Sequence, residues 1–253
     1  MEPEATPRPK AASLWRAVDR LSSLATLTAF CAFVVGAAFV IRDGGGATSA
    51  SQVTAAGTAV DQESIAGDVT MPLGRIVKGH ESARLAVVEF SDFECPYCAR
   101  YATGTHARLE REYVDTGKVR YAFRHLPLTQ IHPNAVKAAE AAECAGRQGR
   151  FWDMYDQLFA NRTSLGPENL AQHAAAIGLD RRGFAACLDG AVAAEVAADR
   201  DEAVRLAVTS TPTFLIGEIT GPNEMRIVRR VKGAYPPDVF IAVLDELQEQ
   251  LRR

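Results

Sequence analysis

The order of apolar and polar positions divides the chain into an apolar N-terminal run, a small polar stretch and a longer folded part. Residues 21–41 carry no charge and are rich in Leu, Ala, Phe and Val. A helix of that length, at about 1.5 Å per residue, spans roughly the 30 Å of a bilayer core. Four basic residues precede this run, and Arg42 is the one basic residue among the thirty that follow it. The positive-inside bias therefore predicts a cytoplasmic segment (1–20), a transmembrane anchor (21–41) and the remainder on the periplasmic or extracytoplasmic side of the cell membrane.

Two other interpretations of the apolar run stay open. A cleaved signal peptide is favoured by the small residues Ala47-Thr48-Ser49-Ala50. The apolar region of such a peptide is usually shorter, roughly 7–15 residues, which favours the uncleaved anchor. A buried core helix would normally show a polar face, and this run has only scattered Ser and Thr. Cys31, inside the run, is interpreted as a small lipid-facing side chain.

Residues 42–70 are mostly Gly, Ala, Ser, Thr and Gln, with few large apolar side chains. Such a composition has too little apolar surface to bury and is typical of a flexible linker. The sequence therefore predicts a linker over 42–70 and a folded domain over 71–253. One good-sized domain is what a chain of 253 residues with such an appendage allows.

The folded part reads as a strand–helix–strand unit, a helical insert and a strand–strand–helix unit. The crossover between the first two strands needs a helix, which predicts a parallel pair and an α/β fold. The insert covers about 129–208 and is interrupted near Gly166-Pro167. Within it an apolar stripe at helical spacing is predicted to be core, namely Phe151, Met154, Tyr155, Leu158 and Phe159. The expected elements are strands at Leu85 to Ser91, Val119 to Leu126, Pro212 to Ile216 and Met225 to Val231, and helices from Cys95 to about Thr116 and from about Pro237.

Charge excludes one class of partner. The net charge is −3, and the basic clusters Arg181-Arg182 and Arg226 to Lys232 are short. The second cluster alternates with apolar residues as a strand does. Nucleic-acid binding needs a clustered basic face, so we predict no nucleic-acid partner.

The five cysteines indicate redox chemistry. With Cys31 set aside, an even four remain, which fits one reactive pair and one structural pair in an oxidising compartment. Cys144 and Cys187 are the predicted structural disulfide; its loop of about 43 residues would contribute on the order of 4 kcal/mol. Two separately buried thiols are the alternative.

Cys95 and Cys98 form the candidate reactive pair, because they follow a strand directly and open a helix. Unpaired backbone N–H groups and the helix dipole favour a thiolate there. Pro96 suits the first helical turn. The spacing of three residues places both sulfurs on one side of that turn. We predict that Cys95 is the exposed attacking sulfur and that Cys98 resolves the mixed disulfide.

Two alternatives apply to the same pair. Half of a zinc site would need two further ligands, and the sequence has no second Cys-x-x-Cys and no His-x-x-His pair. We therefore predict no metal. An inert structural disulfide would gain little from closing so short a loop.

The stretch 88–98 (Val-Glu-Phe-Ser-Asp-Phe-Glu-Cys-Pro-Tyr-Cys) resembles the active-site segment of membrane-anchored DsbA-like thiol–disulfide oxidoreductases. Residues 148–152 (Gln-Gly-Arg-Phe-Trp) and 211–214 (Thr-Pro-Thr-Phe) match as well. The resemblance implies a thioredoxin-like fold with an inserted helical subdomain. It also implies a cis Pro212 facing the cysteines. Substrate binding would then involve Pro96, Tyr97, Thr211 and Pro212.

The resemblance also assigns a role to Glu89, which matches the buried acid of the family. Its apolar flanks argue for burial in a central parallel strand. A carboxyl buried there would have a raised pKa and could pass a proton to or from Cys98. An exposed strand residue is the alternative.

Tyr97 departs from the family pattern, since the best-known oxidases carry His at this position. Tyr cannot supply the positive charge that helps stabilise the neighbouring thiolate, so we expect a less oxidising pair. Thr211 before Pro212 also occurs in isomerase-type relatives. Those relatives add a dimerisation domain, and the stretch 42–70 is too short and too polar to be one.

The sequence therefore predicts a protein disulfide oxidoreductase, most simply a disulfide-forming oxidase, acting as a monomer without a cofactor. Its expected partners are exported proteins with cysteines and a membrane redox partner, a quinone-linked oxidase or reductase. A reductase or isomerase on the same scaffold, a tethered peptide-binding holdase and a zinc-stabilised module are the alternatives.

Overall fold

A seven-stranded sheet organises residues 60–253, the part of the chain that the structure, a computed structural model, describes. The strand order is β1-β7-β6-β4-β5-β3, and β2 also pairs with β7. The strands are β1 (Gln62–Ser64), β2 (Thr70–Pro72), β3 (Val77–Lys78), β4 (Leu85–Ser91), β5 (Val119–His125), β6 (Thr213–Gly221) and β7 (Glu224–Lys232).

The expected parallel pair is present. β4 and β5 run parallel, and β4 pairs on its other side with β6 in antiparallel orientation. Every residue of β4 is buried, as a central strand covered on both faces requires. The helical run between the two strands is formed by α1 (Pro96–Tyr101), η1 (Ala102–His106), α2 (Ala107–Leu109) and η2 (Glu110–Val114).

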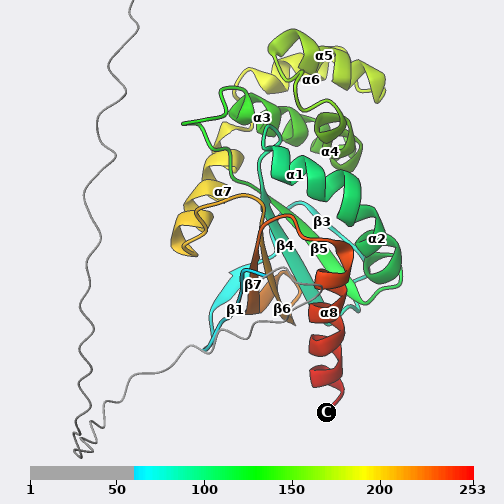
Figure 1. Cartoon of the computed structure of the whole chain (residues 1–253). Helices are drawn as coiled ribbons and strands as arrows, with labels where there is room; N and C mark the ends of the chain where they lie inside the picture. Colours follow the sequence, from blue (N-terminus) through cyan, green and yellow to red (C-terminus); the bar gives the residue numbers. More distant parts are fainter. Residues whose placement is uncertain (1–59) are drawn as a thin grey trace, which may run out of the picture. The chain divides into compact units, whose positions relative to one another are not determined.

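The predicted helical insert lies between β5 and β6. Five helices form it, and α3 to α6 gather beyond the end of the sheet, beside α1 (Figure 1). A last helix, α8, packs beside the α1–η2 run. The helices are α3 (Ala135–Gly146), α4 (Phe151–Ala160), α5 (Pro167–Ala176), α6 (Arg181–Leu188), α7 (Ala193–Arg205) and α8 (Pro237–Arg252).

Alternation along β4 divides the core into two layers. Successive side chains of a strand point to opposite faces. Leu85 and Val87 pack with Phe240 and Leu244 of α8 on one face, while Val88 on the other face packs in a cluster that includes residues of β6, β7 and α7. A third apolar cluster fills the insert and reaches the start of α1. The α4 stripe predicted as core belongs to it, namely Phe151, Met154, Tyr155, Leu158 and Phe159.

Three short strands escaped prediction. β1 pairs with the C-terminal part of β7 and β2 with its N-terminal part, while β3 pairs with β5. Each has only two or three residues, so no alternation of apolar and polar residues reveals it. The predicted linker boundary is therefore wrong at its end: Gln62–Ser64 and Thr70, inside the range 42–70, belong to strands of the sheet.

The predicted single-pass membrane localisation needs correction. Among the helices described between residues 60 and 253, none has the length and apolar character needed to cross a bilayer. The segments predicted at 1–20 and 21–41, with Cys31, lie outside the described residues. We therefore withdraw the localisation.

Cys144 and Cys187, the pair predicted as structural, are joined by a disulfide in the insert. Cys144 lies in α3 and Cys187 in α6. The bond closes a loop with a sequence separation of 43 residues and ties together two helices of the insert.

A buried cluster of charged residues anchors the insert to the sheet. Asp199 of α7 accepts hydrogen bonds from Arg124 at 2.7 Å, from Arg75 at 3.0 Å and from the backbone N–H of His125 at 3.0 Å. His125 also lies 2.9 Å from Glu143, which pairs with Arg75. Burial raises the pKa of Glu143, but hydrogen bonds from His125 and Arg75 outweigh it and lower the pKa to about 2.

The donor atoms of His125, Glu143 and Asp199 lie within 4.8 Å of one another, as the ligands of a metal ion would. The guanidinium groups of Arg75 and Arg124 already bind these carboxylates. We therefore interpret the cluster as a structural ion-pair network. The sequence did not reveal it, because its members come from separate elements.

Asp199→Ala should destabilise the domain by about 3–5 kcal/mol, because it leaves the buried Arg124 without its partner. Urea unfolding of the variant measures this loss. Asp201→Ala on the same helix is the control, since Asp201 is exposed and should change the free energy of unfolding by less than about 0.5 kcal/mol. Equal effects of the two substitutions would refute the anchoring role of the network.

Candidate active site

Cys95 and Cys98 occupy the junction between β4 and α1. Cys95 is the N-cap residue of α1, in extended conformation, and Pro96 takes the first helical position. The backbone N–H of Cys95 donates to the Asp92 carbonyl at 3.1 Å, which closes the turn after the strand. Both cysteines are free thiols, so the described state is the reduced one.

The predicted exposure of Cys95 is wrong. Its residue surface is 4% accessible, while Pro96 and Tyr97 beside it are exposed. Burial arises because the Cys95 sulfur lies 3.7 Å from the Thr211 carbonyl oxygen and packs at the edge of the core of the insert. A substrate must therefore displace part of this cover before it reaches the sulfur.

The two thiols have opposite acidities. A hydrogen bond from Cys98, followed by the backbone N–H groups of Cys98 and Tyr97, lowers the pKa of Cys95 to about 6, although burial opposes this. Burial, and then the hydrogen bond and charge of Cys95, raise the pKa of Cys98 well above its ordinary value. The N-cap position thus separates a thiolate from a protonated thiol one helical turn away.

Thr211 and Pro212 face the cysteine pair. The peptide bond between them is cis, as the family resemblance implied. Thr211 precedes β6, which begins at Thr213 rather than at the predicted Pro212. The carbonyl oxygen of Thr211 therefore faces the Cys95 sulfur and does not pair with a neighbouring strand.

Glu89 is fully buried in β4. Burial raises the pKa of its carboxyl to about 7, although the hydrogen bond from Tyr121, the nearby Ser91 hydroxyl, the hydrogen bond from Tyr155 and the charge of Lys78 act in the opposite direction. The Tyr121 hydroxyl donates to Oε2 at 2.7 Å and the Tyr155 hydroxyl at 3.3 Å. The carboxyl is thus poised to hold or release a proton near neutral pH.

Ser91 connects this carboxyl to the cysteines. It follows Glu89 by two residues and therefore points to the same face of β4. Burial raises the pKa of both Glu89 and Cys98. The buried Ser91 hydroxyl makes no hydrogen bond to either group, but it lies near enough to both to lower each pKa. Sequence reasoning missed Ser91. Its spacing from Glu89 on a central strand was the signal available.

Tyr121 and Tyr155 were also not predicted as site residues. Tyr121 lies on β5 and Tyr155 on α4, and both are fully buried. The Tyr155 position was correctly predicted as core, but no pattern in the sequence shows which buried hydroxyl reaches a carboxylate. Only the packing of β4, β5 and α4 brings these three residues together.

A groove of about 810 Å³ adjoins the cysteine pair. Tyr97, Thr211 and Pro212, three of the four residues predicted to bind substrate, line it. Pro96 is exposed beside it. The remaining lining comes mainly from α1, η1, the end of β7 and the segment after it, and includes Asp61, Arg100, Thr105, Lys232 and Tyr235.

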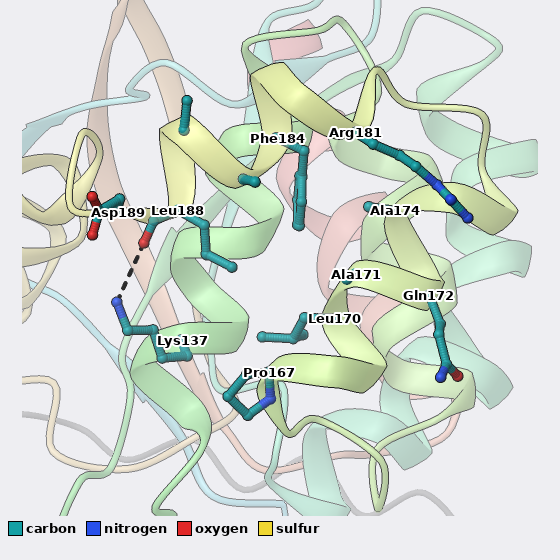
Figure 2. Close-up of a pocket in the computed structure, with 12 residues that line it drawn as sticks. Lys137, Pro167, Leu170, Ala171, Gln172, Ala174, Arg181, Phe184, Leu188 and Asp189 are labelled. Atoms are coloured by element: carbon teal, nitrogen blue, oxygen red, sulfur yellow. Dashed lines mark hydrogen bonds between the residues drawn. The ribbon is translucent and has the colours of Figure 1, made fainter.

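A second cavity, of about 720 Å³, lies in the helical insert (Figure 2). Leu170 and Phe184 form its apolar walls, and Lys137 and Arg181 lie among the polar residues around it. Figure 2 shows Lys137 directed to the Leu188 carbonyl. None of its lining residues belongs to the cysteine site, so this cavity has no part in the chemistry described here.

A family model described as Thioredoxin matches residues 73–226, more than half of the chain. The chain therefore belongs to the thioredoxin family. Its solved neighbours include DsbA proteins: DsbA1 of Wolbachia pipientis (25% identity, TM-score 0.60, 69% of this chain and 90% of that one) and DsbA2 of Pseudomonas aeruginosa (28%, 0.53, 68% and 92%). BdbD of Bacillus subtilis (21%, 0.59, 72% and 97%) shares the fold. These similarities support a thiol–disulfide oxidoreductase in general terms.

The curated relatives of the chain are named Na(+)/H(+) antiporters, unlike the DsbA proteins among its solved neighbours. Na(+)/H(+) antiporter NhaA 3 of Salinispora tropica is 44% identical over 141 residues, and an NhaA antiporter of Herminiimonas arsenicoxydans is 39% identical over 170 residues. The matches cover 55% and 67% of this chain. They cover only 21% and 25% of those proteins, so the chain spans about a quarter of their length or less.

Alkylation by iodoacetamide should show the separation of the two thiols. We expect the rate at Cys95 to rise with pH with a midpoint near 6, because the thiolate is the reacting form and the pKa of Cys95 is about 6. Cys98 should stay unmodified at pH 9. Mass spectrometry after timed quenching locates the label, and the urea-unfolded protein is the control. A midpoint for Cys95 near the ordinary thiol pKa would disprove the acidity assigned to it.

Glu89→Gln should stabilise the domain more at pH 8 than at pH 5. The carboxyl has a folded pKa of about 7 against an ordinary 4.5, so the folded state binds the extra proton between these values. Wild-type stability therefore falls as pH rises through this window, by on the order of 3 kcal/mol. Urea unfolding at both pH values tests this, with the exposed Glu81→Gln as control. The same difference between variant and wild type at both pH values would rule out the raised pKa.

Proposed function

We propose that this chain is a disulfide-forming oxidase that transfers the Cys95–Cys98 disulfide to protein substrates with cysteines. The observation that carries the proposal is the acidity difference within the pair: the pKa of Cys95 is lowered and that of Cys98 is raised. A stabilised Cys95 thiolate favours the reduced form of the pair. Its disulfide is correspondingly oxidising.

The reaction has two exchange steps. A substrate thiolate attacks the Cys95 sulfur of the oxidised pair; the Cys95–Cys98 bond breaks and Cys98 leaves as a thiolate, which takes up a proton. A second thiolate of the substrate then attacks the substrate sulfur of the mixed disulfide and releases Cys95 as a thiolate. The substrate loses two electrons to the cysteine pair, and its new disulfide is the product.

Cys95 suits the second step because a thiol of low pKa is the better leaving group. Cys98 is the poorer leaving group of the first step, because its pKa is raised, and it therefore needs a proton as it leaves. Its thiolate is buried and therefore unfavourable, so it must gain a proton at once or attack again. Glu89, with a pKa of about 7 and Ser91 beside both groups, is the proposed proton source.

In a reductase the same exchange would run in reverse: Cys95 would attack a substrate disulfide, and Glu89 would accept the proton of Cys98. We favour the oxidase because of the lowered pKa of Cys95. Tyr97 supplies no positive charge, which favours a moderate potential over a strongly oxidising one. A second redox protein that resets the pair, and a monomeric state, are part of the proposal.

The antiporter activity named for the curated relatives is not proposed here. The chain covers 21% to 25% of those two proteins. The cysteine site described above accounts for the buried acid, the paired thiols and the adjoining groove without it.

Cys98→Ala should accumulate more covalent complexes with substrate proteins through Cys95 than the wild type does. Cys98 can no longer attack the Cys95 sulfur and return the substrate, so only a second substrate thiol can release each complex. Non-reducing electrophoresis with reduced, unfolded ribonuclease as substrate, at pH 7 in the presence of an oxidant, measures this. The matched control is Cys95→Ala, which should form no such complexes, since Cys98 is fully buried.

The reduction potential of the wild-type pair tests direction in the same preparation. We expect a value less negative than about −270 mV, from equilibration with glutathione. A value below about −300 mV, together with no trapped complexes, would contradict the proposed oxidase.

A further inference from the structure

The groove beside the cysteine pair has an uneven charge. Its charged lining residues are Asp61, Arg100 and Lys232. None of them forms an ion pair with another side chain within the described part of the chain. The groove lining therefore includes two positive charges and one negative charge that no ion pair neutralises.

Lys232 and Asp61 lie close together. The backbone N–H of Lys232 donates to the Asp61 carbonyl at 2.9 Å, and the Asp61 N–H donates to the Tyr235 hydroxyl at 2.7 Å. Opposite charges on such neighbouring residues offset each other at distances within the Debye length. The uncompensated positive charge of the groove is therefore that of Arg100.

Arg100 is held in place at the groove wall. Its guanidinium lies 5.0 Å from the centre of the exposed Tyr97 ring and donates to the Ala234 carbonyl at 3.2 Å. A guanidinium has five N–H donors, so most of them remain for a ligand. Planar paired donors of this kind suit a carboxylate.

We infer that the groove selects extended protein segments that carry Asp or Glu near the reacting cysteine, and that Arg100 is the residue that determines this specificity. The inference rests on the proposed exchange at Cys95 and names its substrate class. Arg100 follows Cys95 by five residues on one helix, about 7.5 Å along the axis. An extended segment rises about 3.3 Å per residue, so the acidic side chain lies two or three positions from the substrate cysteine.

The test compares two dithiol peptides that differ only in Glu or Lys three positions from the first cysteine. The full chain, kept oxidised by glutathione disulfide, is assayed for kcat/KM of peptide disulfide formation. We expect the Glu peptide to react about fivefold faster than the Lys peptide, as partly exposed ion pairs allow. The ratio should fall in 0.5 M NaCl because salt screens such pairs.

Variants assign the preference to Arg100. Arg100→Gln should bring the ratio below about twofold, Arg100→Glu should reverse it, and Arg100→Lys should keep most of it. Arg111→Gln, an exposed cation on η2 outside the groove, is the matched control and should leave the ratio unchanged. Asp61→Asn should raise the ratio. Because the ratio is taken within each variant, any change in Cys95 reactivity cancels.

The outcomes separate the two proposals. Oxidation of both peptides at equal rates, or a ratio that Arg100→Gln leaves unchanged, overturns the specificity while the oxidase stands. Oxidation of neither peptide by the wild-type chain overturns the proposed function, and the specificity falls with it.

Discussion

The removal of β4 from water is the constraint on which the rest of the site depends. Every residue of this strand is buried, yet it carries Glu89 and Ser91 and leads directly into Cys95. Charge on such groups is unfavourable unless hydrogen bonds meet it. The chemistry at the end of the strand is therefore decided by which groups receive hydrogen bonds and which do not.

Burial and hydrogen bonding distribute charge unequally among three acids. Cys95 ends the strand at a helix start, where the Cys98 thiol and backbone N–H groups stabilise its thiolate. Cys98, one turn into the helix, keeps its proton because burial prevails there. Glu89, deeper still, receives two tyrosine hydroxyls, and its pKa nevertheless rises to about 7. Position along the strand and helix thus separates the proposed nucleophile from the two proposed proton carriers.

Local patterns predicted the elements that create this arrangement. An apolar β-branched stretch followed by Cys-Pro and a helical period placed Cys95 at a helix start, and the last helix was found from its apolar stripe. Cys98 was placed by its spacing from Cys95, whereas Glu89 was assigned from the family resemblance and from its apolar flanks. Strand β4 was predicted at its observed bounds, Leu85–Ser91.

Features that depend on distant parts of the chain were not predictable in this way. The cover over Cys95 comes from Thr211, 116 residues away, which is why its exposure was wrongly expected. Tyr121 and Tyr155 reach Glu89 from two other elements, and Asp199 gathers Arg75, Arg124 and His125 from separate segments. Strands β1 to β3 have only two or three residues each and show no alternation of apolar and polar positions. Their pairing with the longer strands β7 and β5 defines them.

Electrostatics also couple the proton to the disulfide exchange. Glu89 and a Cys98 thiolate would be two buried anions near the same serine, and two like charges in a site of low polarity raise each other's pKa. In the proposed exchange, Cys98 leaves Cys95 as a thiolate and protonation relieves that repulsion. A carboxyl with a pKa raised to about 7 would be able to hold the required proton near neutral pH. A carboxyl with an ordinary pKa would already be ionised, and would oppose the bond cleavage instead of assisting it. The burial that makes Glu89 costly for the fold is thus the property that suits it to the exchange.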